Sequence, residues 1–304
     1  MTQQRCQELH SGQEVTAPPV ERPPSLFKYC SPERADILEN LKIRFTQPVL
    51  FNDIFECFPG TDQSPDFERA FKNLALRIAK AISENPHWSR RTRRAYEREE
   101  ARKFEKWCKA ESTKTSHERL CEEVQVRISA TMGMLCLSGK WDNTLMWSHY
   151  TDDHRGFVIE FAGTDCFFDL GFEKVEYSAE RPLLLNRPDG WNDPAVFNTK
   201  SPDWEYEQEY RKVEYFGKEH ILPDGGKFIE FPPLSEIDQQ NWPIHLRDVP
   251  PSAIRKLIFG YRASEETKLR LRTALKQESL KHVLCAQARP HPKLFKMEQA
   301  ETSR

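Results

Sequence analysis

The sequence predicts an α+β fold: a mixed, mostly antiparallel central sheet with flanking helices and a helical insertion. Short apolar segments typical of strands, such as Gly133–Ser138 and Gly156–Phe161, are concentrated after residue 128. Helix-spaced apolar residues dominate residues 64–128. The strands and helices do not alternate regularly, which argues against parallel β-α-β units. At 304 residues with 38% hydrophobic residues, the chain is long enough to bury a large core.

The expected organisation is a single domain with polar ends. Residues 1–24 are polar and end in a proline-rich run, which predicts a disordered leader. Residues 25–290 form the α+β domain, with the helical insertion at 64–128. Residues 291–304 are expected to be a polar tail.

Each element has a local signal. Ser25–Cys30 is a short strand, and Ser31 followed by Pro32 is typical of a helix start. Glycines at Asp224–Gly226 suit a hairpin turn, and Ser264 begins a charged helix that runs to Gln277. Further strands are expected at 42–46, 133–138, 156–161, 174–177, 204–213, 254–260 and 283–286.

Composition limits the classes of function. The formal net charge of -2 and the pI near 6.5 give no global field that would attract nucleic acid or a membrane. The chain has no apolar run long enough to span a bilayer and no signal-peptide core, so we expect a soluble, cytoplasmic protein without a membrane partner. The eight cysteines include no C-x-x-C pair, so reduced thiols are expected and no metal.

One local stretch is strongly basic. The segment 86–120 has eleven Lys or Arg residues and six Asp or Glu residues, and its most basic run is Arg90, Arg91, Arg93 and Arg94. A solvated helical face is one interpretation. The other is a non-catalytic module that binds nucleic acid or a partner protein through these arginines.

The segment 204–213 alternates aromatic residues with charged ones. If it is a strand, Glu205, Glu207, Glu209 and Arg211 lie on one side of it. On an ordinary half-buried strand this charged side faces water. Three carboxylates in line repel each other, however, so the alternative is a positive partner, either a basic strand or a cationic substrate.

Two histidines flank an acidic turn. His149 and His154 are five residues apart, which is not the spacing that presents two ligands on one helical face. His149 is therefore interpreted as an acid/base residue near a pocket or as a structural residue. A metal-dependent nuclease or hydrolase that uses both histidines with Asp152 or Asp153 is a further alternative. Ser148 beside His149 is no catalytic pair if both lie in a strand, and the chain has no G-x-S-x-G and no glycine-rich phosphate loop.

Several motifs together resemble a known family. They are Phe27-Lys28-Tyr29, Phe51-Asn52-Asp53-Ile54-Phe55-Glu56, the segment 135–138, Leu145 to Tyr150 with His154 and Gly156, and Trp204 with 206–211. In this order they resemble the bacterial domain of unknown function 2971 family across most of residues 25–290. That family often has proline where this chain has Ile54, and residues 64–127 resemble a long insertion in it.

The resemblance implies, more distantly, similarity to ADP-ribosyltransferase-like folds, with NAD as co-substrate and a role as a toxin or phage-defence effector. Lys28 would take the basic position of the first strand, although arginine or histidine is usual there, and no Ser-Thr-Ser element follows. Tyr29 or Tyr150 could stack on nicotinamide. Glu209 would hold the ribose, and Glu207 would orient an acceptor. His149 and Arg211 complete the set of residues expected around one cleft.

Overall fold

The computed structural model describes residues 22–60, 116–169, 172–183, 194–216, 218–221, 227–230 and 234–302. The expectations for the leader (except residues 22–24), for most of the insertion and for Arg90, Arg91, Arg93 and Arg94 concern residues outside these ranges. Within the described part, no helix is both long and apolar enough to cross a bilayer.

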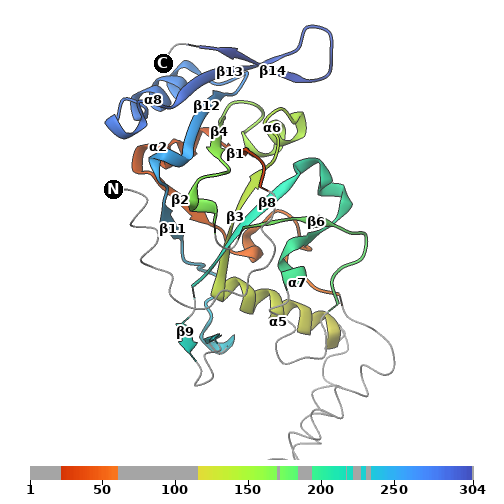
Figure 1. Ribbon diagram of the computed structural model, residues 1–304. Helices are drawn as coiled ribbons and strands as arrows, with labels where there is room; N and C mark the ends of the chain where they lie inside the picture. The colour runs from red at the N-terminus through yellow and green to blue at the C-terminus, as the bar shows by residue number, and fades with distance from the viewer. Residues whose placement is uncertain are drawn as a thin grey trace, which may run out of the picture.

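An eight-stranded sheet organises the structure (Figure 1), in the order β14-β13-β12-β4-β1-β3-β8-β5. Its strands are β1 (Ser25–Cys30), β3 (Met132–Ser138), β4 (Phe157–Ala162), β5 (Phe172–Lys174), β8 (Glu209–Tyr215), β12 (Ile254–Phe259), β13 (Leu284–Pro290) and β14 (Met297–Glu301). Only the β12–β13 pair within this sheet is parallel. The predicted fold class, α+β with a mixed, mostly antiparallel sheet, is therefore confirmed.

Smaller strand pairs surround this sheet. They are β2 (Lys42–Phe45) with β11 (His245–Asp248), β6 (Glu176–Tyr177) with β7 (Thr199–Lys200), and β9 (Lys218–Ile221) with β10 (Lys227–Glu230). The β9–β10 pair is antiparallel, and the turn expected at Asp224–Gly226 between these two strands lies outside the described residues.

Helices and 3-10 turns cover the sheet. The α-helices are α2 (Asp36–Asn40), α5 (Ser116–Thr131), α6 (Thr144–Tyr150), α7 (Pro194–Asn198) and α8 (Glu265–Ala274). The 3-10 turns are η1 (Pro32–Ala35), η2 (Pro48–Leu50), η3 (Cys166–Phe168), η5 (Pro202–Glu207), η6 (Leu234–Glu236), η7 (Pro251–Ala253) and η8 (Glu278–Leu280). Ser264 caps α8 by accepting a hydrogen bond from the Thr267 N–H, as a helix-start serine should. In Figure 1, α8 lies at the top, beside β12 and β13, and α5 lies at the lower end of the sheet.

Successive residues of the central strands pack on opposite faces of the sheet. The first face carries Leu26, Ile159 and Leu257, which pack with α2 and α8 in one hydrophobic cluster. The second face carries Phe27, Val158 and Ile258, which pack with the α6 residues Met146 and Trp147. Because both faces of the sheet are covered, the sequences of the central strands are nearly continuous apolar runs.

The second face holds another apolar cluster farther along β3 and β8. Met132, Met134 and Val213 pack there against Val124 and Ile128 of α5, together with α7. Glu209 and Arg211 of β8 lie on this same face of the sheet, because they alternate in step with Val213 along the strand. The second face therefore has an apolar cluster under α6, an apolar cluster under α5 and α7, and a polar region that both clusters border.

Three segments differ from the sequence-based expectation. Residues 202–207 form the 3-10 turn η5, and the strand begins only at Glu209, so the single strand predicted over 204–213 was wrong. Residues 144–150 form a helix, so Ser148 and His149 are not neighbours in a strand. The segment 297–301, within the expected polar tail, pairs with β13 as an edge strand of the sheet.

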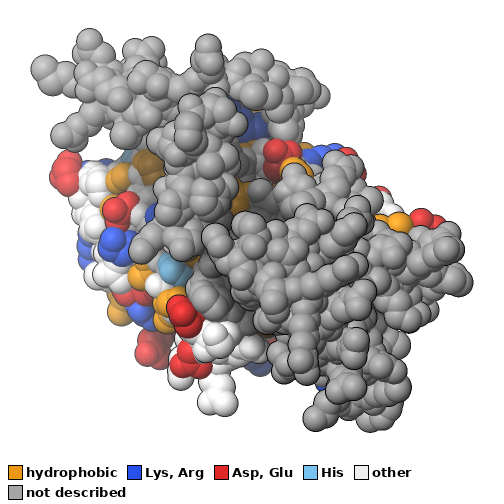
Figure 2. All heavy atoms as spheres, turned by 90° about the horizontal axis from the view of Figure 1, so that it is seen from below, with side chains coloured by type: hydrophobic (Ala, Val, Ile, Leu, Met, Phe, Trp, Pro, Cys, Tyr) orange, Lys and Arg blue, Asp and Glu red, His pale blue; other side chains and the backbone are white. Residues whose placement is uncertain are grey.

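The described part of the surface in Figure 2 mixes charges. Acidic, basic and hydrophobic side chains are interspersed there, and in that part no one kind forms a broad patch. The described part of the face seen in Figure 2 therefore offers no extended field of one sign for a polyanionic partner.

Candidate functional site

The candidate site lies where the sheet opens between β1 and β3. The two strands pair at Phe27 and Ser138. At the other end of β3, Thr46 forms an isolated bridge with Met134. Between these positions the Lys28 ammonium donates to the Cys136 carbonyl at 3.0 Å, so a side chain takes the place of a ladder hydrogen bond. In this opening the edge of β3 that faces β1 has no paired strand among the described residues and borders the interior of the fold.

A cavity of about 190 Å³ occupies this opening. Aromatic rings and polar groups from five separate segments form its wall. The lining residues are Phe27, Lys28, Tyr29, Thr46, Phe51, Asn52, Glu56, Cys136, Leu137, Ser138, Met146, Tyr150, Lys200, Glu207 and Glu209. The structure therefore brings five sequence-predicted residues together, namely Lys28, Tyr29, Tyr150, Glu207 and Glu209, while His149 and Arg211 do not line the cavity.

A left-handed residue directs both glutamates toward the same cation. Glu207 ends η5, Gln208 has φ 46°, and Glu209 begins β8. The Ser138 hydroxyl donates to the Glu207 carbonyl at 2.6 Å and fixes this corner against β3. The two carboxylates converge through this turn, and not through the period of one strand on which the sequence argument relied.

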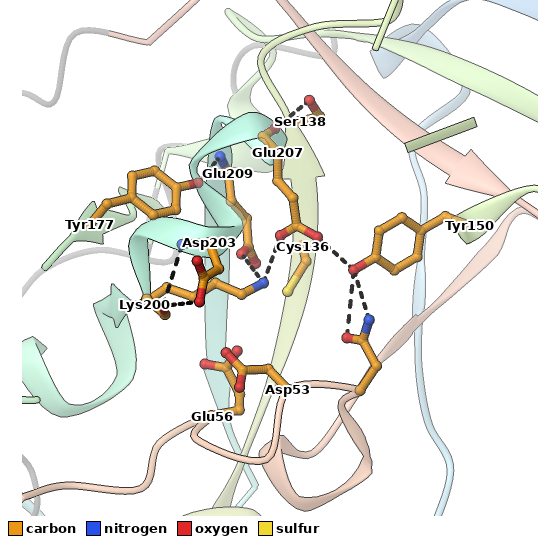
Figure 3. A network of polar contacts seen from close by, with 12 residues as sticks. Asp53, Glu56, Cys136, Ser138, Tyr150, Tyr177, Lys200, Asp203, Glu207 and Glu209 are labelled. Atoms are coloured by element: carbon orange, nitrogen blue, oxygen red, sulfur yellow. Dashed lines mark hydrogen bonds and ion pairs between the residues drawn. The ribbon is translucent and has the colours of Figure 1, made fainter. Parts of the chain in front are cut away.

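Lys200 is the cation on which they converge (Figure 3). Its ammonium lies 2.6 Å from Glu207 Oε2 and 3.1 Å from Glu209 Oε2, and it sits over the ring of Trp204. Burial alone would lower the pKa of Lys200, but Glu209 and Glu207 outweigh it and raise that pKa, so the ammonium stays charged. The pair of carboxylates thus shares one permanent positive charge.

The two glutamates have opposite pKa shifts although they share Lys200. Burial raises the pKa of Glu207, and Lys200 offsets this only in part. Burial also acts on Glu209, but Arg211 and Lys200 together bring its pKa below the usual range. Neighbouring carboxyl groups whose environments separate their pKa values are typical of acid and base roles in one site. The surroundings of Glu207 thus favour its protonated form, whereas those of Glu209 favour its ionised form.

Tyr150 contacts Glu207 from the opposite side. Its hydroxyl donates to Glu207 Oε1 at 2.6 Å and accepts from the Asn52 amide at 3.1 Å. Burial and the adjacent Glu207 raise the pKa of Tyr150, so the phenol keeps its proton and remains a donor. Asn143 caps α6 by accepting from the Leu145 and Met146 N–H groups, and this helix positions the phenol.

Arg211 is a buried positioning residue. Its side chain is fully buried, and its guanidinium forms bidentate pairs with Glu209 and Glu56. It also donates to the Phe197 carbonyl at 2.5 Å. These five hydrogen bonds use all five N–H donors of an arginine. All donors of Arg211 are therefore engaged within the protein, where they hold Glu209 and Glu56 in place.

The remaining predicted residues lie around α6. His149 is exposed, and its ring neighbours those of Tyr150 and Tyr206. The ring of His154 stacks on buried Trp147 with centroids 6.2 Å apart, and burial lowers the pKa of His154. Asp152 and Asp153 pair with Arg155. Among the described residues, no group of three or more His, Cys, Asp or Glu side chains is arranged to hold a metal ion.

Sequence reasoning missed three contributors to the site. Glu56 belongs to a quoted motif, but the motif gave no sign that its carboxylate meets Arg211. Lys200 comes from a two-residue strand after a loop, so no periodic pattern singled it out. Asn52 also lay in a motif without an assigned role. One signal could have led to Lys200 and Arg211, namely the row of three acidic residues, because closely spaced carboxylates require positive charge nearby.

The comparisons with known proteins cover part of this site. The family model described as "Protein of unknown function (DUF2971)" matches residues 146–212. This segment runs from α6 into β8 and includes Tyr150, Glu207, Glu209 and Arg211, so the expected resemblance is confirmed over it. Searches among curated proteins and among solved structures found no match. The family description assigns no activity, and none of the comparisons links the chain to ADP-ribosyltransferases.

Proposed function

We propose that the protein cleaves the N-glycosidic bond of NAD and transfers the ADP-ribosyl group to an acceptor. The observation that carries this proposal is the position of Glu207. Its carboxyl has a raised pKa, lies between Tyr150 and Lys200, and lines a cavity that also has aromatic walls. A carboxyl in such a position suits a reaction in which positive charge develops on a sugar carbon.

The size of the cavity suits one ring of the dinucleotide. An apolar cavity of roughly 150 Å³ accommodates benzene, whereas pockets for larger ligands span roughly 300 to 1,000 Å³. At about 190 Å³, this cavity has room for a six-membered ring with a small substituent, such as nicotinamide. The aromatic side chains Tyr29, Phe51 and Tyr150 would contact the ring, and the rest of NAD would lie outside the cavity.

The chemistry assigns a role to each charged group. When the bond between the ribose carbon and the nicotinamide nitrogen breaks, the electron pair moves to the ring nitrogen and the ribose carbon becomes positive. The ionised carboxylates stabilise that charge, and the acceptor then forms the new bond. Glu207 receives the acceptor's proton, a role for which a raised pKa is suited. Lys200 and Tyr150 hold the Glu207 carboxylate in place through their hydrogen bonds.

The contacts change the roles that the resemblance implied. Glu209 is tied to Arg211 and Lys200, whereas Glu207 contacts Lys200 and Tyr150 and forms no ion pair with Arg211 in the described part of the structure. We therefore place Glu207 at the reacting centre and give Glu209 the role of fixing Lys200. Lys28 keeps the place that the resemblance gave it, on the first strand and in the cavity wall.

The test is release of nicotinamide from millimolar NAD, measured by chromatography with water as the acceptor. We expect Glu207→Gln to lower the rate by at least about 100-fold, the size of a lost general base. Glu205→Gln is the matched control, because Glu205 lies on the same 3-10 turn but is exposed and lines neither cavity described for this protein. Equal rates for wild type and Glu207→Gln, or no release by the wild type, would contradict the proposal.

A further inference from the structure

A second cavity lies on the other side of Lys200. It has a volume of about 180 Å³ and is walled by the segment after η2, the segment after β6, and α7 with β7. Its lining residues are Asp53, Phe55, Phe58, Ser178, Ala179, Glu180, Arg181, Pro182, Val196, Thr199, Lys200 and Ser201. Lys200 lines both cavities, so they are separated by about the width of one side chain.

The wall of this cavity contains a carboxylate without a cation. Asp53 is 6% exposed, and its Oδ1 accepts a hydrogen bond from the Phe55 N–H at 2.9 Å. Among the described residues it has no ion-pair partner, and in Figure 3 no dashed line reaches its carboxylate. A buried carboxylate normally has a cationic partner, because removing the charge from water is costly. Asp53 therefore leaves a place for a positive group.

Neither of the two cations in the same wall forms an ion pair with Asp53. The Lys200 ammonium is already bonded to Glu207 and Glu209. The guanidinium of Arg181 lies 5.5 Å from the ring centroids of both Phe55 and Phe58, and Arg181 is exposed at the rim. These two rings thus already form a surface that holds a planar cation. The cavity therefore combines a buried anion with an aromatic surface suited to a cation.

We propose that this second cavity binds a cationic side chain of the acceptor, a guanidinium or an ammonium group, with Asp53 as its anionic anchor. The inference rests on the proposed function, and it names the chemical class of the acceptor. Phe55 contributes a cation–π contact, and the hydroxyls of Ser178 and Ser201, which already accept from the Glu180 and Asp203 N–H groups, each keep a second lone pair for the ligand. The cation bound there lies next to Lys200 and therefore next to Glu207.

The transfer step balances with such an acceptor. A nitrogen of the acceptor, once it has given up a proton and has a free electron pair, forms a bond to the ribose carbon, and the bond from that carbon to nicotinamide breaks. The electron pair of the broken bond remains on the nicotinamide ring nitrogen. The proton that the acceptor nitrogen loses goes to the Glu207 carboxylate. No oxidant or metal is needed.

An anionic ligand is the competing occupant, because Arg181 could hold a phosphate at the rim. The geometry favours the cation, since the charge without a partner is the buried Asp53, whereas Arg181 is exposed and already contacts two rings. The two occupants predict opposite effects of removing Arg181. Loss of its guanidinium frees the aromatic surface for a cation but removes the exposed cation that would hold a phosphate at this rim.

The experiment uses agmatine, which carries a guanidinium and an ammonium group, and follows binding to the full-length protein by ligand-observed NMR. We expect saturable binding that Asp53→Asn weakens at least about tenfold, because the amide keeps the hydrogen bond from Phe55 but loses the charge. Glu205→Gln should bind agmatine like the wild type. Arg181→Gln should bind it more tightly, and Phe55→Ala, a change at a half-exposed ring, should bind it more weakly.

Three results would overturn the inference: no agmatine binding by the wild type, equal binding by Asp53→Asn and Glu205→Gln, or binding of inorganic phosphate that Arg181→Gln abolishes. Its failure is distinguishable from failure of the proposed function. Agmatine binding that depends on Asp53, without nicotinamide release, would retain a cation site and reject NAD cleavage. Nicotinamide release without agmatine binding would retain the reaction and reject this acceptor site.

Discussion

Replacing Arg211 by methionine should strongly destabilise the protein. The change removes the guanidinium that pairs with Glu209 and Glu56 and leaves a side chain of similar length. Glu209 would still have Lys200 at 3.1 Å, but Glu56, whose side chain is 2% exposed, would be left without the only cation that pairs with it in the described structure. Removing one partner of a buried ion pair costs about 3 to 5 kcal/mol. We expect a loss in this range in the free energy of unfolding at neutral pH.

Urea unfolding followed by tryptophan fluorescence measures this loss. Arg155→Met is the control, because Arg155 forms its ion pairs at the surface, where such pairs contribute about 0 to 1 kcal/mol. Adding Glu56→Gln to Arg211→Met should restore more than about 1 kcal/mol, since it removes the unpaired charge. If Arg211→Met unfolds within about 1 kcal/mol of the control, or if the double variant is no more stable, Arg211 does not hold the network as described.

Three further predictions concern the site and its support. The pKa of a glutamate in the unfolded chain is about 4.3, and the stability of wild type relative to Glu207→Gln should fall as pH rises above this value toward the raised pKa of Glu207. The stability of wild type relative to Glu209→Gln should be present above about pH 4.3 and lost at lower pH. Urea unfolding across pH measures both differences, and parallel curves would contradict the opposite pKa shifts. Tyr150→Phe removes a donor to Glu207, so the acid limb of the nicotinamide-release profile should move to higher pH, and an unmoved limb would separate Glu207 from the reaction. Gly156→Ala should lower the melting temperature far more than Gly60→Ala. A Cβ at Gly156 would overlap the carbonyl of the last residue of β1, whereas a Cβ at Gly60 would make only ordinary contacts. Similar melting temperatures for the two variants would refute this packing.

Patterns within single segments predicted the class of fold. The apolar segments near 133–138, 156–161 and 254–260 all form strands of the main sheet, because a strand covered on both faces requires a continuous apolar run. The same reasoning failed at 204–207, where alternation of aromatic and acidic residues resembled a strand. Those residues form a 3-10 turn, and the alternation there reflects contacts to Lys200 and Tyr150 and not a pleat.

The composition of the site was only partly predictable for a related reason. Lys28, Tyr29, Tyr150, Glu207 and Glu209 were identified from motifs, and the structure places them around one cavity. The sequence could not show that Arg211 faces inward, since a charged residue in a strand next to acidic ones usually faces water. Nor could it show which cation pairs with the glutamates, because Lys200 lies in the two-residue strand β7, before η5, and no sequence pattern links it to them.

The most direct test of the central claim is calorimetric titration of NAD into the wild-type protein, Glu207→Gln and Glu205→Gln. The account predicts saturable binding by the wild type and by Glu205→Gln, with a changed affinity for Glu207→Gln. Of these two glutamates, Glu207 lines the cavity and Glu205 does not. No heat of binding at millimolar NAD, or identical affinities for all three proteins, would contradict the claim that this cavity receives the nicotinamide end of NAD.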